Sequence, residues 1–111
     1  MGSSQLDLYR GMCLVAAWEQ RLLRFIEEGR TSGFYHAGRG QEATAVGAVA
    51  PLRRDDYLLY DHRGLGHAIT KGVPMDKLFG DFLGTSEGTT RGLGAGIVHI
   101  AWPDAGVLGQ S

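Results

Sequence analysis

The sequence predicts an α/β chain that is mostly helical, with one or two short strands. Apolar residues recur every three or four positions over residues 5–28, which is the period of an amphipathic helix. Shorter segments bounded by glycine or proline predict further helices, and the apolar run at residues 57–60 predicts a strand. With 111 residues, 43% of them apolar, the chain is long enough for one domain with a hydrophobic core.

The predicted helix over residues 5–28 has a signal at each end. Ser4 is suited to cap its first turn, with Asp7 three positions later, and Gly29 is suited to end it. Glu19 lies off the apolar stripe with the other polar residues of the helix. The stripe, which we expect to face the core, comprises Leu14, Trp18, Leu22 and either Phe25 or Ile26.

The middle of the chain predicts a helix, a turn and a strand in that order. Residues 41–50 favour a short helix whose small side chains permit close packing, and Pro51 stops it. Residues 53–56 are expected to form a charged turn. Residues 57–60 then predict a short buried strand bounded by polar residues.

Two helices and a glycine-rich loop are expected after this strand. Residues 66–71 indicate a helix closed by Gly72, and Pro74 begins another that runs to about residue 83. Residues 84–96 have no apolar period, so we expect a loop that only a ligand or partner would hold. Residues 97–100 favour a second short strand. The side chains expected to face inward from the last helix are Leu78, Phe79 and Phe82.

Charge and composition exclude several classes of partner. Eleven basic and twelve acidic residues leave a formal net charge of −1, so we expect neither nucleic-acid binding nor attraction to a membrane surface. No apolar run approaches the roughly 20 residues that span a bilayer, and the first residues lack a signal-peptide pattern. The single cysteine, Cys13, is expected in the helix core and has no disulfide partner in the chain, which favours a reducing, cytoplasmic compartment.

The strongest functional signal follows the predicted strand. There Arg63 is flanked by His62 and Gly64, and such a pattern favours anion binding, because glycine lets a phosphate approach the backbone and a guanidinium donates hydrogen bonds to it. The alternative is a surface arginine that caps a helix or pairs with Asp61. His62 and His67 are five residues apart, off a common helix face, which argues against a metal site.

Several short motifs follow one another along nearly the whole chain. They comprise Gly33-Phe34-Tyr35-His36, Gly40-Gln41-Glu42-Ala43, Asp56-Tyr57, His62-Arg63-Gly64-Leu65-Gly66-His67, Lys71-Gly72 and a glycine-rich loop ending in His99-Ile100-Ala101. Their order and spacing, from about Leu8 to Gln110, resemble the amino-terminal part of the alpha subunit of thiamine-diphosphate-dependent 2-oxo acid dehydrogenases, of the pyruvate and acetoin dehydrogenase type.

The resemblance implies an α/β thiamine-diphosphate-binding fold, of which residues 1–111 would form a partial, mostly helical amino-terminal portion. It implies pairing with a beta subunit as a heterotetramer that holds thiamine diphosphate with magnesium at the subunit interface. The complete enzyme would be an oxidoreductase that decarboxylates a small 2-oxo acid, or cleaves acetoin. It would pass the acyl group to the lipoyl carrier of an acyltransferase component.

The resemblance also assigns roles to three residues. His36 matches the histidine on the substrate side of the site and is the candidate catalytic residue; a loop histidine bonded to nearby backbone is the alternative. Arg63 matches the arginine that holds the cofactor diphosphate. His62, its candidate cofactor-binding neighbour, stands where pyruvate-type members have tyrosine and acetoin-type members have histidine.

This sequence departs from the family pattern in three respects. Leu65 replaces a histidine found in many members, and residues 92–99 keep the glycines and the histidine of the family's loop but lose its lysine and serine. The family's magnesium-diphosphate motif lies downstream of the residues present, so we expect the metal ligands outside this chain. We therefore expect these 111 residues alone to be inactive. Two alternatives are a non-catalytic module for subunit assembly and a stand-alone anion-binding domain.

Overall fold

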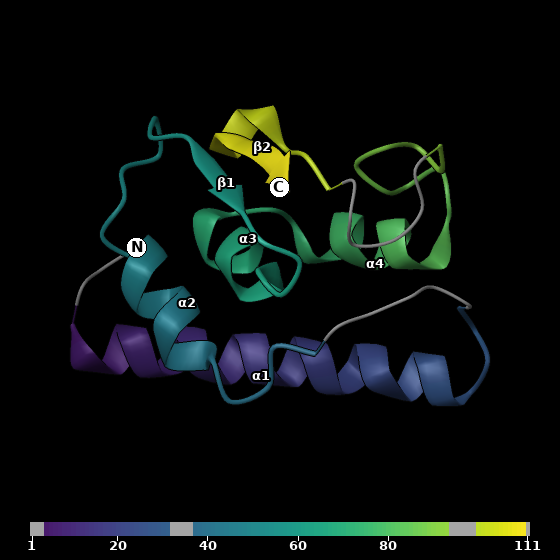
Figure 1. Cartoon of the computed structure of the whole chain (residues 1–111), viewed down its shortest axis with the longest axis horizontal. Helices are drawn as coiled ribbons and strands as arrows, with labels where there is room; N and C mark the ends of the chain where they lie inside the picture. The colour runs from purple at the N-terminus through teal and green to yellow at the C-terminus, as the bar shows by residue number, and fades with distance from the viewer. Residues whose placement is uncertain (1–3, 32–36, 94–99, 111) are drawn as a thin grey trace.

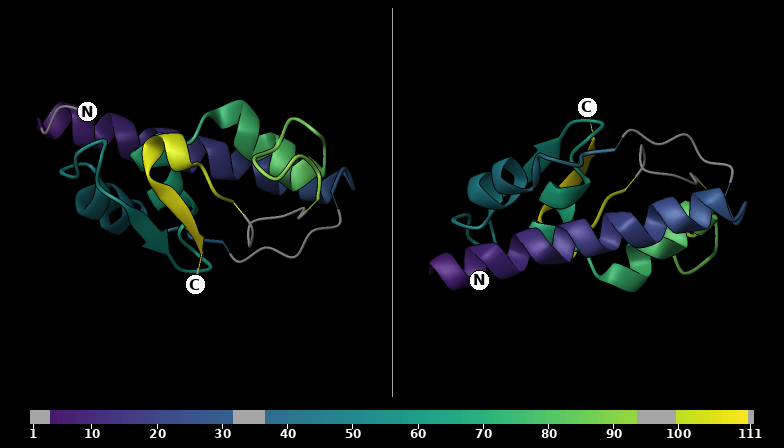
Figure 2. Two further views of the ribbon diagram at one scale, coloured as in Figure 1. Left: turned by 90° about the horizontal axis from the view of Figure 1, so that it is seen from above. Right: turned by 90° about the horizontal axis from the view of Figure 1, so that it is seen from below.

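The computed structural model describes residues 4–31, 37–93 and 100–110. Helix α1 runs along one side of the molecule, α2 and α3 lie against it, and the small sheet lies beyond α3 (Figure 1). Helix α4 lies beside the C-terminal half of α1 in both views of Figure 2. In chain order the elements are α1 (Gln5–Glu27), α2 (Glu42–Val49), β1 (Leu58–Tyr60), α3 (Leu65–Lys71), α4 (Met75–Leu83), a 3-10 helix η2 (Pro103–Ala105) and β2 (Val107–Gln110).

This arrangement confirms the prediction of a mostly helical α/β chain. Strands β1 and β2 form a parallel pair, in which Leu58 is opposite Val107 and Tyr60 is opposite Gln110. A parallel pair needs a crossover, and helices α3 and α4 occupy the connection between the two strands. None of the helices in the described part of the chain is long and apolar enough to cross a lipid bilayer.

The predicted signals at the two ends of α1 are confirmed. The hydroxyl oxygen of Ser4 accepts a hydrogen bond of 3.1 Å from the backbone N–H of Asp7. At the other end Gly29 has a φ of +73°, and its N–H donates to the carbonyl oxygen of Ile26 over 3.1 Å. Both interactions are local, since each joins residues within one turn.

The buried face of α1 differs from the predicted stripe. Leu14 is 49% exposed and Cys13 is also exposed, so neither lies in the core. Glu19, expected off the stripe, is only 7% exposed. Helices α2 and α3 pack against α1, and the face buried there includes Val15 and Glu19 but not Leu14. The buried residues of α1 are Gly11, Val15, Trp18, Glu19 and Leu22.

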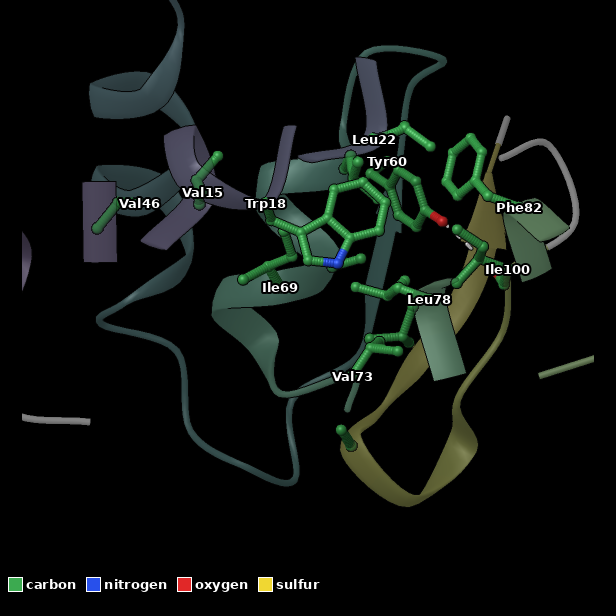
Figure 3. Packing of buried hydrophobic residues seen from close by; sticks show 14 of the residues in the cluster. Val15, Trp18, Leu22, Val46, Tyr60, Ile69, Val73, Leu78, Phe82 and Ile100 are labelled. Carbon is green, nitrogen blue, oxygen red and sulfur yellow. Dashed lines mark hydrogen bonds between the residues drawn. The ribbon is translucent and has the colours of Figure 1, made fainter. Parts of the chain in front are cut away.

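Trp18 is at the centre of the hydrophobic core. Its ring stacks on Phe79 with centroids 4.6 Å apart and meets Phe82 at 5.5 Å. Figure 3 shows the indole among side chains from α1, α3, α4 and the sheet. Leu78 and Phe82 are buried and Phe79 is half-buried, which confirms the predicted inner face of α4. The aromatic contacts therefore join α4 to α1.

The predicted strand at residues 57–60 exists but is buried on one face only. Tyr60 is buried, and its hydroxyl donates to the carbonyl oxygen of Ile100 over 3.5 Å. Burial, together with the negative charge of Asp81, raises the pKa of Tyr60 above its ordinary value. Leu59 is 65% exposed because it points away from the core, as alternate residues of a strand do.

The sequence did not indicate β2, whose position depends on a buried lysine. Lys71, at the end of α3, is 8% exposed, and its ammonium donates to the carbonyl oxygens of Arg54 at 3.0 Å and Ala105 at 2.5 Å. These bonds tie η2 to the turn before β1. Strand β2 follows η2 directly, so the same contacts bring it alongside β1. The second strand expected at residues 97–100 lies outside the described residues except for Ile100, which is buried coil.

Other predicted elements are confirmed with small changes of bounds. Helix α2 precedes Pro51, and α3 ends at Gly72. The predicted charged turn is held by Asp56, whose carboxylate accepts the backbone N–H of Arg53 over 2.7 Å. This hydrogen bond and one from the Arg53 side chain lower the pKa of Asp56. The turn therefore forms through local charge-assisted contacts.

The loop after α4 is held by the chain itself, contrary to the expectation that a ligand or partner would be needed. Asp81 is 1% exposed, and its carboxylate accepts hydrogen bonds from the Thr89 hydroxyl at 2.6 Å and the Thr90 backbone N–H at 3.2 Å. Thr89 and Thr90 lie eight and nine residues further along the chain. A buried carboxylate needs such donors, so it orders the described part of the loop, residues 84–93.

We predict that Asp81→Ala lowers the free energy of unfolding by about 1–3 kcal/mol, because the half-buried Thr89 hydroxyl and Thr90 backbone N–H lose their acceptor. Urea unfolding followed by circular dichroism measures the change. Glu87→Ala is the matched control, since Glu87 belongs to the same loop but is exposed, and its effect should be within about 0.5 kcal/mol. Equal losses in the two variants would contradict the anchoring role of Asp81.

Candidate functional site

Arg63 lies in the turn between β1 and α3, and its guanidinium is exposed. The carboxylate of Asp61 accepts the backbone N–H of Arg63 over 3.0 Å, so it caps the turn instead of pairing with the Arg63 side chain. Among the described residues the ion pairs formed by arginine and lysine do not include Arg63. The alternative of an Arg63–Asp61 ion pair is therefore wrong, and the cation faces solvent from a fixed turn.

The start of α3 is fixed by close helix packing at Gly66. A Cβ atom at this position would lie 2.9 Å from the Cβ of Ala45 and 3.0 Å from a methyl carbon of Val15. Helices α1 and α2 thus approach the backbone of α3 so closely that no side chain fits between them. Arg63 precedes Gly66 by three residues, so this contact positions its turn.

A second backbone segment lies against the Arg63 turn. A Cβ atom at Gly38 would lie 3.0 Å from the carbonyl oxygen of Arg63. The N–H of Gly38 donates to the Glu19 carboxylate over 3.1 Å, and its carbonyl oxygen accepts from the N–H of Gln41 over 3.0 Å. The turn that leads into α2 is thus held between α1 and the Arg63 turn. His36, the candidate catalytic residue, lies outside the described residues.

Helices α1, α2 and α3 and the Arg63 turn border a small cavity that is lined by both polar and apolar residues. Its volume is about 10 Å³, roughly that of one water probe. The Nδ1 atom of His67 is buried and has no hydrogen-bond partner among the described residues. The cavity lining consists of Val15, Glu19, Gly38, Gln41, Glu42, Ala45, Arg63, Gly66 and His67.

A larger groove lies next to this cavity and shares Glu19 and Glu42 with it. Its volume is about 430 Å³, and α1 supplies most of its lining, including Tyr9 and Cys13. A hydrogen bond to the Cys13 side chain, and the charge of that group, raise the pKa of the exposed Tyr9. The cysteine is therefore accessible from outside, contrary to the expectation that the core would enclose it.

The structure brings some of the predicted site residues together. His62 is exposed and precedes Arg63 in the same turn. Glu42 accepts the backbone N–H of Gly40 at 3.0 Å, at the start of α2. The glycine-rich segment 94–99 lies outside the described residues. In the described ranges, 4–31, 37–93 and 100–110, no three His, Cys, Asp or Glu side chains form a group suited to a metal ion.

The residue that the sequence did not indicate is Glu19. Polar residues on an amphipathic helix usually face water, and the surrounding pattern gave no sign of an exception. A weak signal lay in the spacing of Glu19 from its neighbours. Glu19 follows Val15 by four residues and precedes Leu22 by three, so it lies on the same helix face as these two buried residues.

Substitution at Gly66 tests the helix contact that positions Arg63. We predict that Gly66→Ala lowers the free energy of unfolding by about 1–3 kcal/mol, because the new methyl group overlaps Ala45 and Val15. Gly47→Ala is the control, because Gly47 lies in α2 with no atom within 4 Å of the added Cβ. Alanine at this position should raise the free energy of unfolding by up to about 1 kcal/mol. Thermal unfolding distinguishes the two variants. A change in stability of the same sign in both would contradict the packing argument.

The sequence is similar to proteins of one known family. Residues 9–103 match the family model described as dehydrogenase E1 component. The alpha subunit of acetoin:2,6-dichlorophenolindophenol oxidoreductase from Bacillus subtilis is 36% identical over 106 residues, covering 96% of this chain and 32% of that protein. The subunit of the same name from Cupriavidus necator has the same identity and coverage.

A pyruvate dehydrogenase relative is similar over a slightly shorter range. The E1 component subunit alpha from Porphyra purpurea is 35% identical over 95 residues, covering 86% of this chain and 27% of that protein. This chain therefore spans about a third or less of the length of these relatives. Since the family model matches most of the sequence, the chain belongs to the dehydrogenase E1 component family.

Proposed function

We propose that this chain forms the amino-terminal segment of an E1 alpha subunit that binds thiamine diphosphate, and that Arg63 contacts the diphosphate. The observation that carries the proposal is the exposed Arg63 guanidinium, which is not engaged by Asp61 and stands on a turn fixed by Gly66 and Gly38. A guanidinium on a rigid turn offers several hydrogen-bond donors to phosphate oxygens without first breaking an ion pair.

We assign one part of the cofactor to the described residues. Arg63 would contact the diphosphate, with His62 beside it in the same turn. His36 would lie at the substrate side, a role that comes from the family resemblance alone. When bound, thiamine diphosphate supplies the carbanion chemistry at its thiazolium ring. Magnesium ligands belong, in this proposal, to residues outside this chain.

The proposed reaction follows from the family and its relatives. The complete enzyme would act as an oxidoreductase on a 2-oxo acid such as pyruvate, or on acetoin, and would pass the acyl group to a lipoyl carrier. Its partners would be a beta subunit, in a heterotetramer, and a lipoyl acyltransferase. We place the enzyme in the cytoplasm, in keeping with the single cysteine of this sequence.

A non-catalytic assembly module is the second candidate, and one observation favours it. The outer side of α1 exposes Leu6, Tyr9 and Leu14 by 57%, 63% and 49%. Trp18 and Leu22, which belong to the same predicted stripe as Leu14, are buried and contribute nothing to this surface. Exposed apolar side chains of this kind favour association with another chain. Analytical ultracentrifugation tests the candidate, and a monomer at high concentration would exclude self-assembly through this surface.

The main prediction concerns Arg63 in the assembled enzyme. We expect Arg63→Ala to weaken binding of thiamine diphosphate by about 1–3 kcal/mol, because a charge-assisted contact is lost. Isothermal titration calorimetry with magnesium present measures the dissociation constant. Arg63→Lys should be intermediate, since it keeps the charge but not the planar fork of donors.

Arg10→Ala provides the control for a general loss of positive charge. Arg10 is exposed on α1, in a weak pair with Asp7 at 3.9 Å, and does not line the cavity beside Arg63. Its removal should leave the dissociation constant unchanged. The proposed role of Arg63 is refuted by an unchanged constant for Arg63→Ala. Tight binding to these 111 residues alone, in the presence of magnesium, would favour the stand-alone anion-binding alternative.

A further inference from the structure

Glu19 occupies an unusual place for a carboxylate. It lies on the buried face of α1 with Val15 and Trp18, and only 7% of the residue is exposed. Burying a carboxylate costs free energy unless hydrogen-bond donors replace water. The next residue, Gln20, is exposed, so the helix has an adjacent position that would avoid this cost. A buried carboxylate at position 19 thus calls for a specific contact.

That contact is with the turn that precedes α2. The Glu19 side chain accepts the N–H of Gly38 over 3.1 Å, across 19 residues of sequence. A backbone N–H bonded to a carboxylate is held in both distance and direction. Glu19 therefore fixes Gly38 relative to α1.

Gly38 in turn lies against the residue proposed to bind the phosphate. Its missing Cβ would come within 3.0 Å of the Arg63 carbonyl oxygen, so the two backbones are in close contact. Glu19 and Arg63 also line the same small cavity. A displaced Gly38 would either press on the Arg63 turn or leave one side of it unsupported. Gly66, three residues further along, packs against Val15 and Ala45, so the turn has a second close backbone contact beside it.

We infer that Glu19 is a positioning residue, which holds the Arg63 turn in its anion-binding geometry through the backbone of Gly38. The inference rests on the proposed function of Arg63 and extends it to the residues that support the Arg63 turn. A prepositioned guanidinium binds a phosphate without first ordering its own turn, so loss of the Glu19 contact should weaken anion binding even though Glu19 does not touch the anion.

The test uses two readouts in the assembled E1 enzyme: the dissociation constant for inorganic pyrophosphate by calorimetry, and amide hydrogen exchange at Gly38. We expect Glu19→Ala to weaken pyrophosphate binding about fivefold to tenfold and to speed exchange at Gly38, because the Gly38 N–H loses its acceptor. Glu19→Gln keeps an acceptor oxygen, so its pyrophosphate affinity and its exchange at Gly38 should match those of the wild type. Glu19→Asp keeps the charge but shortens the side chain, so it should behave like alanine.

Leu22→Val is the control for general destabilisation of α1, since Leu22 is fully buried but does not line the cavity. It should lower the melting temperature and leave pyrophosphate affinity unchanged. If Glu19→Ala does not assemble, Glu19→Asp carries the test. Wild-type affinity and exchange in Glu19→Ala or Glu19→Asp, with weakened binding in Arg63→Ala, overturn the inference alone. Wild-type affinity in Arg63→Ala overturns the proposed function as well.

Discussion

The contact of three helices at Gly66 is the constraint on which the candidate site depends. Because Gly66 has no side chain, Val15 of α1 and Ala45 of α2 approach the backbone of α3 directly. This close approach sets where α3 begins and therefore where the preceding turn presents Arg63. Interiors packed at this density deform little, so the turn inherits the rigidity of the helices around it. An anion site built on such a turn needs little ordering when its ligand arrives.

Elements determined by local interactions could be predicted from the sequence. The first helix begins just after Ser4 and ends before Gly29 because capping interactions act within one turn. The face it buries could not be predicted in the same way. Leu14 and Glu19 exchanged their expected environments because the position of α2 and α3 decides which side of an amphipathic helix is covered.

Interactions between distant residues account for the other differences. Strand β2 has four residues, one of them glycine. Its position depends on Lys71, which donates hydrogen bonds to Arg54, before β1, and to Ala105, before β2. The loop after α4 looked unconstrained because threonine and glycine are common in loops, yet Asp81 supplies an internal anchor. In the site, the Arg63 turn and its glycines could be predicted from the sequence, whereas the buried carboxylate behind them could not.

The two-stranded sheet also has one uncovered side. Parallel sheets usually have both faces covered, yet Leu59 of β1 is 65% exposed and Leu108 of β2 is 49% exposed. Water in contact with these leucines is released when another apolar layer covers them, which makes contact with a second surface favourable. At high concentration that second surface can be another copy of the same chain. The solubility of the purified polypeptide should therefore be limited by the exposed leucines of this sheet as well as by the exposed apolar side chains of α1.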